Sequence, residues 1–252
     1  QTTTSKRLAV HLRVCGLNVQ TLEVDNYFVD RAHTPRDETG DYDFEHIEAI
    51  DLALLGQHLK DLAAGKEIDV PTFNFRTGER EYNGKKLRLE EDQVIIMEGI
   101  HCLNPRLTEA LPDDSIYRVY INCITQLRLD NNNRLSTTDV RLIRRLVRDH
   151  HHRGHSARRT LQLWGNVRRG EKRWIFPHQE NADLTINSSM DYELSVLKPH
   201  ARPLLAEVKT IHEEYPEARR LLDFLQYVNG ALSDEVPGDS LLREFIGGSV
   251  FD

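Results

Sequence analysis

The sequence predicts an α/β protein with a mostly parallel sheet flanked by helices. Short apolar runs typical of strands alternate with longer segments whose apolar residues recur every three or four positions, as on one face of a helix. The run 94–97 shows no polar alternation, which is expected for a parallel strand buried on both faces. In such sheets, ligands bind at the carboxyl ends of the strands.

The first half of the chain gives the clearest element boundaries. Gly16 and Gly65 each follow an apolar-periodic segment and are natural helix ends. The stretch 30–45 is polar and acidic and contains Pro35 and Gly40, so we expect a loop or lid there. The expected elements are a helix over 4–15, a strand over 19–24, the loop 30–45, a helix over 45–64, an extended piece over 71–75, a turn at 81–84 and a strand over 94–97.

The second half is predicted to contain two more strands and a group of helices. The expected elements are a strand over 116–121, an arginine-rich helix from about 141, a helix over 156–164, a core strand over 182–186, and helices over 194–213 and 217–227. We expect one domain over 1–252, with residues 141–173 forming a lid region within it.

Composition excludes several classes of protein. The 252 residues are 39% hydrophobic and 29% charged, which is ordinary for a soluble globular protein, and no apolar run approaches the roughly 20 residues of a membrane span. A net charge of -7 argues against a dedicated nucleic-acid-binding protein. Cys15, Cys102 and Cys123 are odd in number and lack CxxC spacing, so we expect reduced thiols and a cytoplasmic location.

Ten arginines between Arg141 and Arg173 stand out in this acidic chain. Four of them, at 141, 144, 145 and 148, share one face of a predicted helix, and we expect no balancing acid four residues further along. The guanidinium fork matches phosphate geometry. The stripe therefore favours a small polyphosphate ligand over a solvated surface helix.

Two carboxylates fall at predicted strand ends. Asp25 follows the strand 19–24, and Glu98 follows the strand 94–97. Acids at this edge of a parallel sheet are candidates for a general base and a metal ligand, although acids in such places also cap helices or face water.

Eight stretches carry a resemblance to a known family. The chain begins Gln1-Thr2-Thr3-Thr4-Ser5-Lys6, which is similar to the end of a phosphate-binding loop, G-x-x-x-x-G-K-[ST], and the helix after it. We expect the strand and glycines of that loop to precede this chain. The order and spacing of the other segments resemble the uridine kinase and phosphoribulokinase group of P-loop kinases; these segments are 24–31, 34–37, 42–45, 96–101, 141–154, 176–183 and 242–249.

Within that group, the chain most resembles long bacterial uridine kinase-like proteins. Those proteins carry an N-terminal region similar to part of threonyl-tRNA synthetase, so the resemblance implies such a region in the full-length protein. It also implies ATP and Mg²⁺ as cofactors and a nucleoside as the substrate, with no membrane or nucleic-acid partner. Whether the protein forms a homo-oligomer stays open.

The resemblance implies roles for individual residues. Asp25 is the expected base for the acceptor hydroxyl, Thr2 and Glu98 the expected Mg²⁺ ligands, and Glu45 the acid that holds the ribose hydroxyls. Gln1, Thr2 and Thr3 occupy the phosphate end of the first helix. Arg145 matches a substrate-side arginine, and Arg148 and Arg153 match lid arginines that reach the ATP phosphates. Phe73 keeps an aromatic in the segment that reads the pyrimidine.

Two positions depart from the family pattern. Gln1 stands where the phosphate-binding lysine is expected, and Gly78 stands where the base-reading histidine is expected. The sequence therefore predicts transfer of the γ-phosphoryl group of ATP to the 5′-hydroxyl of uridine or cytidine, with two alternatives. One is a kinase for another nucleoside or a sugar phosphate, for which Arg36 or Arg76 could bind the extra phosphate. The other is a module that binds ATP without turnover.

Overall fold

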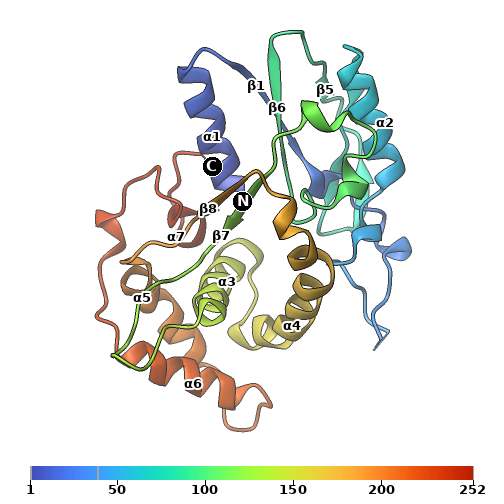
Figure 1. Ribbon diagram of the computed structural model, residues 1–252. Coiled ribbons are helices and arrows are strands. Elements are labelled where there is room, and N and C mark those ends of the chain that lie inside the picture. Colours follow the sequence, from blue (N-terminus) through green and yellow to red (C-terminus); the bar gives the residue numbers. More distant parts are fainter. Residues whose placement is uncertain (1, 39, 252) are drawn as a thin grey trace. The chain divides into compact units, whose positions relative to one another are not determined.

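The computed structural model describes residues 2–38 and 40–251, and in this part of the chain it forms two compact units (Figure 1). The first unit consists of residues up to 120 together with 166–185. The second consists of 121–165 together with the residues from 186 onward. The chain passes from one unit to the other within β7 (Val119–Asn122), α4 (Ala157–Gly170) and β8 (Leu184–Asn187).

The first unit is built around two parallel strands. β1 (Asn18–Glu23) pairs with β6 (Gln93–Glu98) in a register that runs from Asn18 opposite Gln93 to Glu23 opposite Glu98. α1 (Thr2–Val14) packs against both strands. The carboxyl ends of β1 and β6 therefore lie side by side, as the parallel arrangement requires.

Short elements complete the first unit. α2 (Leu52–Ala63) begins where the Asp51 carboxylate accepts a hydrogen bond from the Leu54 N–H, which is a typical N-cap. Two antiparallel pairs follow it: β2 (Ile68–Asp69) with β5 (Lys86–Leu87), and β3 (Thr72–Asn74) with β4 (Glu79–Glu81). The apolar core of this unit includes Leu22, Tyr27, Ile47 and Leu55.

The second unit is mainly helical. α3 (Thr137–Arg153) packs against α5 (Glu193–Ala206) and α7 (Arg243–Ile246), and α5 packs against α6 (Tyr215–Gln226). Ser136 caps α3 by accepting from the Asp139 N–H, and Gly154 ends it with a φ of 63°. The predicted apolar face of α3 is confirmed, since all four of its residues are buried: Leu142, Ile143, Leu146 and Val147.

β7 and β8 form the remaining strand pair. The Arg118 carbonyl accepts from the Leu184 N–H, and the Asn122 carbonyl accepts from the Ser188 N–H. Both strands advance together along this ladder, so they run parallel. The predicted α/β class with parallel strands and flanking helices is confirmed.

The prediction of one helix over 45–64 was wrong in its first turns. Residues Ile47–Ala49 form a 3₁₀ turn, in which His46 Nδ1 accepts from the Glu48 N–H. The Asp51 N–H donates to the Tyr27 carbonyl, which holds the chain in a bend before α2 starts. The apolar residues Ile47 and Ile50 are buried as the periodicity indicated, but they reach the core from this bend.

Two strands are less buried than predicted. Val94 of β6 is 40% exposed and Leu184 of β8 is 44% exposed. Each strand has one hydrogen-bonded neighbour in the described part of the chain, so part of its surface faces solvent. The helix expected over 194–213 ends instead at Ala206.

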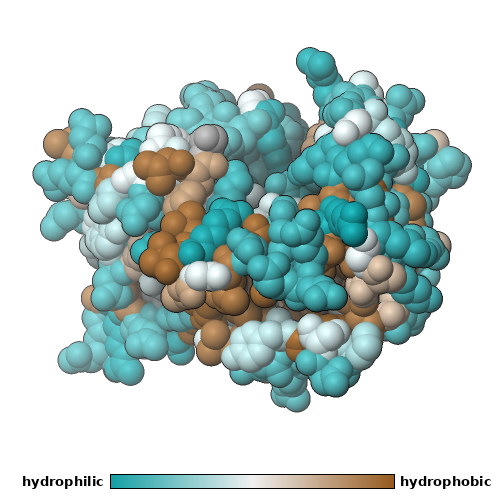
Figure 2. Space-filling model, turned by 90° about the horizontal axis from the view of Figure 1, so that it is seen from above, coloured by the Kyte–Doolittle hydropathy of each residue, from teal (hydrophilic) through white to brown (hydrophobic). Residues whose placement is uncertain are grey.

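The surface is largely polar. Figure 2 shows that hydrophilic residues cover most of one face of the molecule, with smaller groups of hydrophobic residues among them. Among the described residues, no helix combines the length and apolar character that crossing a membrane requires.

Candidate active site

The start of α1 meets the end of β6 in the first unit. Thr2 Oγ1 donates a hydrogen bond of 2.6 Å to Glu98 Oε1. Thr3, the next residue of the helix, is buried. Backbone N–H groups at a helix N-terminus attract anions, so this turn of α1 combines an anion-binding end with a hydroxyl and a carboxylate. Gln1 lies outside the described residues.

Three carboxylates gather at the ends of β1 and β6. Glu23 lies opposite Glu98 in the strand register, and Asp25 belongs to the 3₁₀ turn Val24–Tyr27 that directly follows β1. Burial raises the pKa of Glu98, and the negative charges of Asp25 and Glu23 raise it further, against the lowering effect of the Thr2 hydrogen bond. A bound cation would relieve this like-charge repulsion.

Gly99 lets the two strand ends approach each other. A Cβ atom at this position would lie 2.8 Å from Val24 Cβ, closer than side-chain carbons pack. Since Val24 directly precedes Asp25 and Gly99 directly follows Glu98, this close approach holds the two acids near each other. The same region contains Cys102, where burial raises the thiol pKa and the charges of Glu98 and Asp25 add to the effect.

Glu45 lies in a crowded region. A Cβ atom at Gly170 would lie 2.3 Å from Glu45 Cβ, so the backbone of α4 passes directly over this residue. The adjacent His46 ring packs edge-on against Trp174, with 4.2 Å between the ring centroids.

His101 is a buried histidine in this region that the sequence analysis did not select. Its side chain is 2% exposed, and neither ring nitrogen has a hydrogen-bond partner in the described structure. Burial lowers the pKa of His101 to about 4, and the nearby His46 and His178 add to this shift. His101 is therefore neutral at pH 7. Its position three residues after Glu98 was the available sequence signal.

Phe73 belongs to an aromatic cluster beside the Asp25 turn. Its ring centroid lies 5.4 Å from Phe28 and 5.1 Å from Phe75. Phe73 is 6% exposed, whereas Phe75, which the sequence analysis did not select, is 60% exposed. The Asn26 side-chain oxygen accepts from the Phe73 N–H at 3.2 Å, which ties the cluster to the residue after Asp25.

The predicted lid arginines share one acid in the second unit. Asp149 is fully buried, and its Oδ2 lies 3.2 Å from Arg145 Nε. Its Oδ1 lies 3.5 Å from Arg148 Nη2 and 3.5 Å from Arg153 Nη1. Asp149 thus pairs with all three arginines for which the resemblance implies a role. The spacing of these arginines along the helix does not by itself predict a shared partner.

The expectation that the stripe lacks a balancing acid was wrong. Asp149 stands four residues after Arg145 and pairs with it. Arg144 is only 8% exposed and forms an ion pair with the buried Glu193 of α5. Arg144 Nη2 also donates to the Ser188 carbonyl at 2.8 Å, so this arginine joins α3 to α5 and to the segment after β8.

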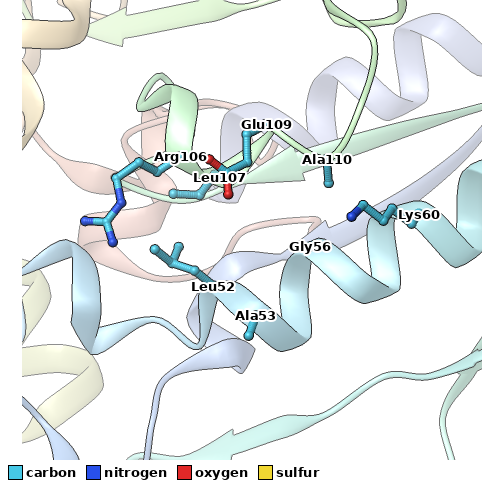
Figure 3. A pocket seen from close by; sticks show the side chains of 8 residues that line it. All are labelled: Leu52, Ala53, Gly56, Lys60, Arg106, Leu107, Glu109 and Ala110. Atoms are coloured by element: carbon cyan, nitrogen blue, oxygen red, sulfur yellow. The ribbon is translucent and has the colours of Figure 1, made fainter.

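A separate cavity of about 380 Å³ opens between α2 and the segment 106–110 (Figure 3). In Figure 3, the side chains of Arg106 and Lys60 lie at opposite ends of the cavity lining, and the Glu109 carboxylate lies between them. None of the candidate site residues described above lines this cavity.

The chain is similar to proteins of one known family. Residues 1–195 match the model of the phosphoribulokinase / uridine kinase family. The chain belongs to this family. Over 184 residues it is 32% identical to a uridine kinase of Tolumonas auensis, and this match covers 72% of this chain and 78% of that protein. It is 30% identical over 172 residues to a uridine kinase of Staphylococcus haemolyticus, which covers 68% of this chain and 74% of that protein.

A solved structure supports the same fold. A protein of Silicibacter sp. TM1040, provisionally assigned as a fructose transport system kinase, superimposes with a TM-score of 0.51 at 19% identity, covering 73% of this chain and 82% of that chain. The protein described here is therefore an α/β P-loop kinase of the phosphoribulokinase / uridine kinase family, and membership implies that it binds ATP.

Proposed function

We propose that this protein transfers the γ-phosphoryl group of ATP to the 5′-hydroxyl of a nucleoside, with uridine or cytidine as the substrate. The observation that carries the proposal is the gathering of Thr2, Asp25 and Glu98 at the ends of α1, β1 and β6. Phosphoryl transfer depends on alignment and charge neutralisation, and this arrangement offers a hydroxyl, two carboxylates and a helix N-terminus together.

Asp25 is the proposed base. Its carboxylate lies near that of Glu98, and its negative charge adds to the burial that raises the pKa of Glu98. In the proposed reaction, Asp25 accepts a hydrogen bond from the nucleoside hydroxyl and orients its oxygen toward the γ-phosphorus. It takes up the hydroxyl proton as the new O–P bond forms and the bond from the γ-phosphorus to the bridging oxygen breaks, which releases ADP. Glu45 is the proposed partner of the ribose hydroxyls.

The residues present fit a magnesium ion. The hydroxyl of Thr2 and the carboxylate of Glu98 are hard oxygen donors 2.6 Å apart, and Mg²⁺ takes few protein oxygens along with several waters. When bound, the ion would neutralise phosphate charge. Thr2 and Glu98 are the proposed ligands, while Thr3 contributes the helix end that faces the phosphates.

The arginines of α3 are proposed to act on the phosphates and the substrate. Arg148 and Arg153 are the proposed contacts to ATP, and Arg145 the proposed contact to substrate. Their shared pairing with the buried Asp149 supports a concerted role, because it restrains three long side chains in one place. The single kinase domain over 1–252, the cytoplasmic location and the threonyl-tRNA synthetase-like N-terminal region are proposals from the same resemblance.

The test is an ATP-consumption assay on the full-length protein with Mg²⁺ and a panel of nucleosides and sugar phosphates. We expect turnover with uridine or cytidine that Asp25→Asn abolishes, because the amide cannot accept the proton. Glu91→Gln, at an exposed acid between β5 and β6, is the matched control and should keep full turnover.

Two other results would replace the proposal. Turnover with a sugar phosphate alone would assign a different acceptor. If the protein binds ATP but no acceptor increases ATP consumption, the protein would be a nucleotide-binding module without turnover. Gln1 in the position of the phosphate-binding lysine favours this alternative.

A further inference from the structure

The last turns of α4 pack against the loop that carries Glu45. Both segments belong to the first unit, which includes residues 166–185 as well as the residues up to 120. Asn166 Nδ2 donates to Asp37 Oδ2 at 3.3 Å, and Arg169 Nη2 lies 3.6 Å from the same oxygen. Asn166 Oδ1 also accepts from Arg169 Nη2 at 2.7 Å, so the two side chains of α4 meet the loop together at Asp37.

Gly170 is the second point of contact between α4 and this loop. Its φ of -58° and ψ of -46° are ordinary for a helix, so any residue could adopt this backbone conformation. Glycine is also less favourable than alanine inside a helix. A Cβ atom at position 170 would overlap Glu45 Cβ. The absence of a side chain therefore serves to make space, because the backbone of α4 lies directly against Glu45.

The π-turn Glu171–Ile175, which continues α4, provides the third point of contact. Its Trp174 ring packs against the ring of His46, the residue that directly follows Glu45. The Nδ1 atom of His46 accepts from the Glu48 N–H, so the ring is held from two sides. Turns of this kind are uncommon and occur frequently at functional sites. One continuous segment, 166–174, thus contacts the loop at Asp37, at Glu45 and at His46.

The loop around Glu45 depends on such contacts from outside. Between the 3₁₀ turns Arg31–His33 and Ile47–Ala49, its described residues form no helix and no strand of more than one paired residue. The Glu45 N–H donates to Asp43 Oδ1 at 3.1 Å, which fixes a local turn. Loops with few regular hydrogen bonds open easily unless other elements hold them. The segment 166–174 is the element that holds this loop.

We infer that Asn166, Gly170 and Trp174 are positioning residues for the sugar of the nucleoside. They hold the loop so that Glu45 meets the ribose hydroxyls, and they act through the loop without contacting the substrate. This inference rests on the proposed function, in which Glu45 is the partner of those hydroxyls. Small displacements matter here, since the groups of a binding site must be held to within about 0.5 Å of their productive positions.

The consequence is a substrate preference that depends on α4. A 2′-deoxynucleoside lacks one of the hydroxyls from which Glu45 would accept a hydrogen bond. Loss of one hydrogen bond to a charged acceptor corresponds to roughly a tenfold or greater loss of affinity, so we expect uridine to bind at least that much more tightly than 2′-deoxyuridine. A change in α4 that leaves Glu45 itself intact should then reduce this difference.

The experiment compares two glycine-to-alanine variants of the full-length protein. Gly170→Ala should displace Glu45, weaken uridine binding about tenfold and reduce the preference over 2′-deoxyuridine, both measured by calorimetry, while the affinity for ATP stays the same. Hydrogen exchange in residues 40–46 should also become faster. The matched control is Gly56→Ala, because Gly56 also lies inside a helix, α2, but a Cβ atom there would be at an ordinary 3.8 Å from Ala110 Cβ. This control should leave all of these values unchanged.

A second position keeps the test decisive if Gly170→Ala does not fold, which thermal melting checks. Asn166→Ala removes the hydrogen bond to Asp37 but favours the helix, so a loss of helix stability cannot account for its effect. Asn166→Asp sets a second carboxylate against that of Asp37, and the two should repel each other. The preference for uridine over 2′-deoxyuridine should therefore fall in Asn166→Ala and fall further in Asn166→Asp.

The outcomes separate this inference from the proposed function. Equal affinity for uridine and 2′-deoxyuridine in the unmodified protein, or an unchanged preference in the folded variants, would overturn the inference even if Asp25→Asn abolishes turnover of uridine. A preference that depends on α4 would uphold it even if no nucleoside is phosphorylated, and the proposed function alone would fail. If the unmodified protein binds no nucleoside, both are wrong.

Discussion

The hydroxyl of Thr2 donates to the carboxylate of Glu98 at 2.6 Å, which joins the first turn of α1 to the last residue of β6. This contact brings together residues 96 positions apart. It also satisfies one oxygen of a carboxylate that is partly buried near two other acids. Like charges kept close at strand ends are a cost to folding that a bound cation would offset.

The first prediction is that Glu98→Gln separates stability from activity. The amide keeps an acceptor for Thr2 but removes one charge from the group with Asp25 and Glu23. We expect turnover to fall by about 10²-fold or more, as for loss of a group that stabilises transition-state charge. The melting temperature in the absence of Mg²⁺ should stay the same or rise.

The pH dependence of this variant has a defined sign. The pKa of Glu98 is raised in the folded state, so the folded protein binds its proton more readily than the unfolded chain does. The stability that this proton binding contributes is present below the pKa of Glu98 in the unfolded chain. It is lost as the pH rises through the pKa of Glu98 in the folded protein. Glu98→Gln should therefore gain stability relative to the unmodified protein as pH rises. A constant difference between their melting temperatures across this range would contradict the prediction.

The second prediction concerns His101, whose pKa is lowered on folding, whereas that of Glu98 is raised. Its pKa falls from 6.5 to about 4 on folding, chiefly through burial. The stability that this shift contributes is fully present above pH 6.5 and is lost as pH falls toward 4, by roughly 3 kcal/mol. His101→Gln cannot take up this proton. Denaturant unfolding from pH 7 to 4 should show a smaller loss for the variant, and identical losses would exclude His101 as the titrating group.

The sequence was sufficient to predict the features that depend on local pattern. Asp25 and Glu98 were selected because acids followed strand-like runs, and parallel pairing of β1 with β6 does bring those ends together. Gly154 ends the arginine helix, and the apolar face of that helix is buried.

Features that depend on distant contacts could not be predicted from local pattern. The burial of Arg144 depends on Glu193, which lies 49 residues away, and no local pattern distinguishes this arginine from its neighbours. The start of α2 depends on the bond between the Asp51 N–H and the Tyr27 carbonyl. The placement of Arg31 over Gly78 likewise requires a hairpin to fold back on the segment after Asp25.

The third prediction distinguishes the arginines of α3 by their partners. Arg144→Ala would leave the carboxylate of Glu193 buried without its partner, so we expect a loss of about 3–5 kcal/mol in the free energy of unfolding. Arg148 and Arg153 are more exposed. Their alanine variants should unfold nearly as the unmodified protein does, yet lose about 10³-fold in kcat if they contact the transferring phosphate. Denaturant melts and steady-state rates on the same preparations separate the two classes, and equal stability losses in all three variants would contradict this distinction.

The fourth prediction concerns Asp149, whose carboxylate faces three arginines from a fully buried position. Asp149→Asn removes the charge but keeps the shape, so Arg145, Arg148 and Arg153 would lose their common partner and repel one another. We expect a loss of about 3 kcal/mol in unfolding free energy, as for a broken buried ion pair.

The matched control is Asp223→Asn on α6, because Asp223 also pairs with an arginine four residues away, Arg219, but is 49% exposed. Exposed pairs of this kind contribute about 0.3–0.5 kcal/mol, so the control should change little. Urea titrations of both variants at low and high salt decide the matter: if the Asp149 variant is as stable as the control, the arginines do not depend on this acid for their placement.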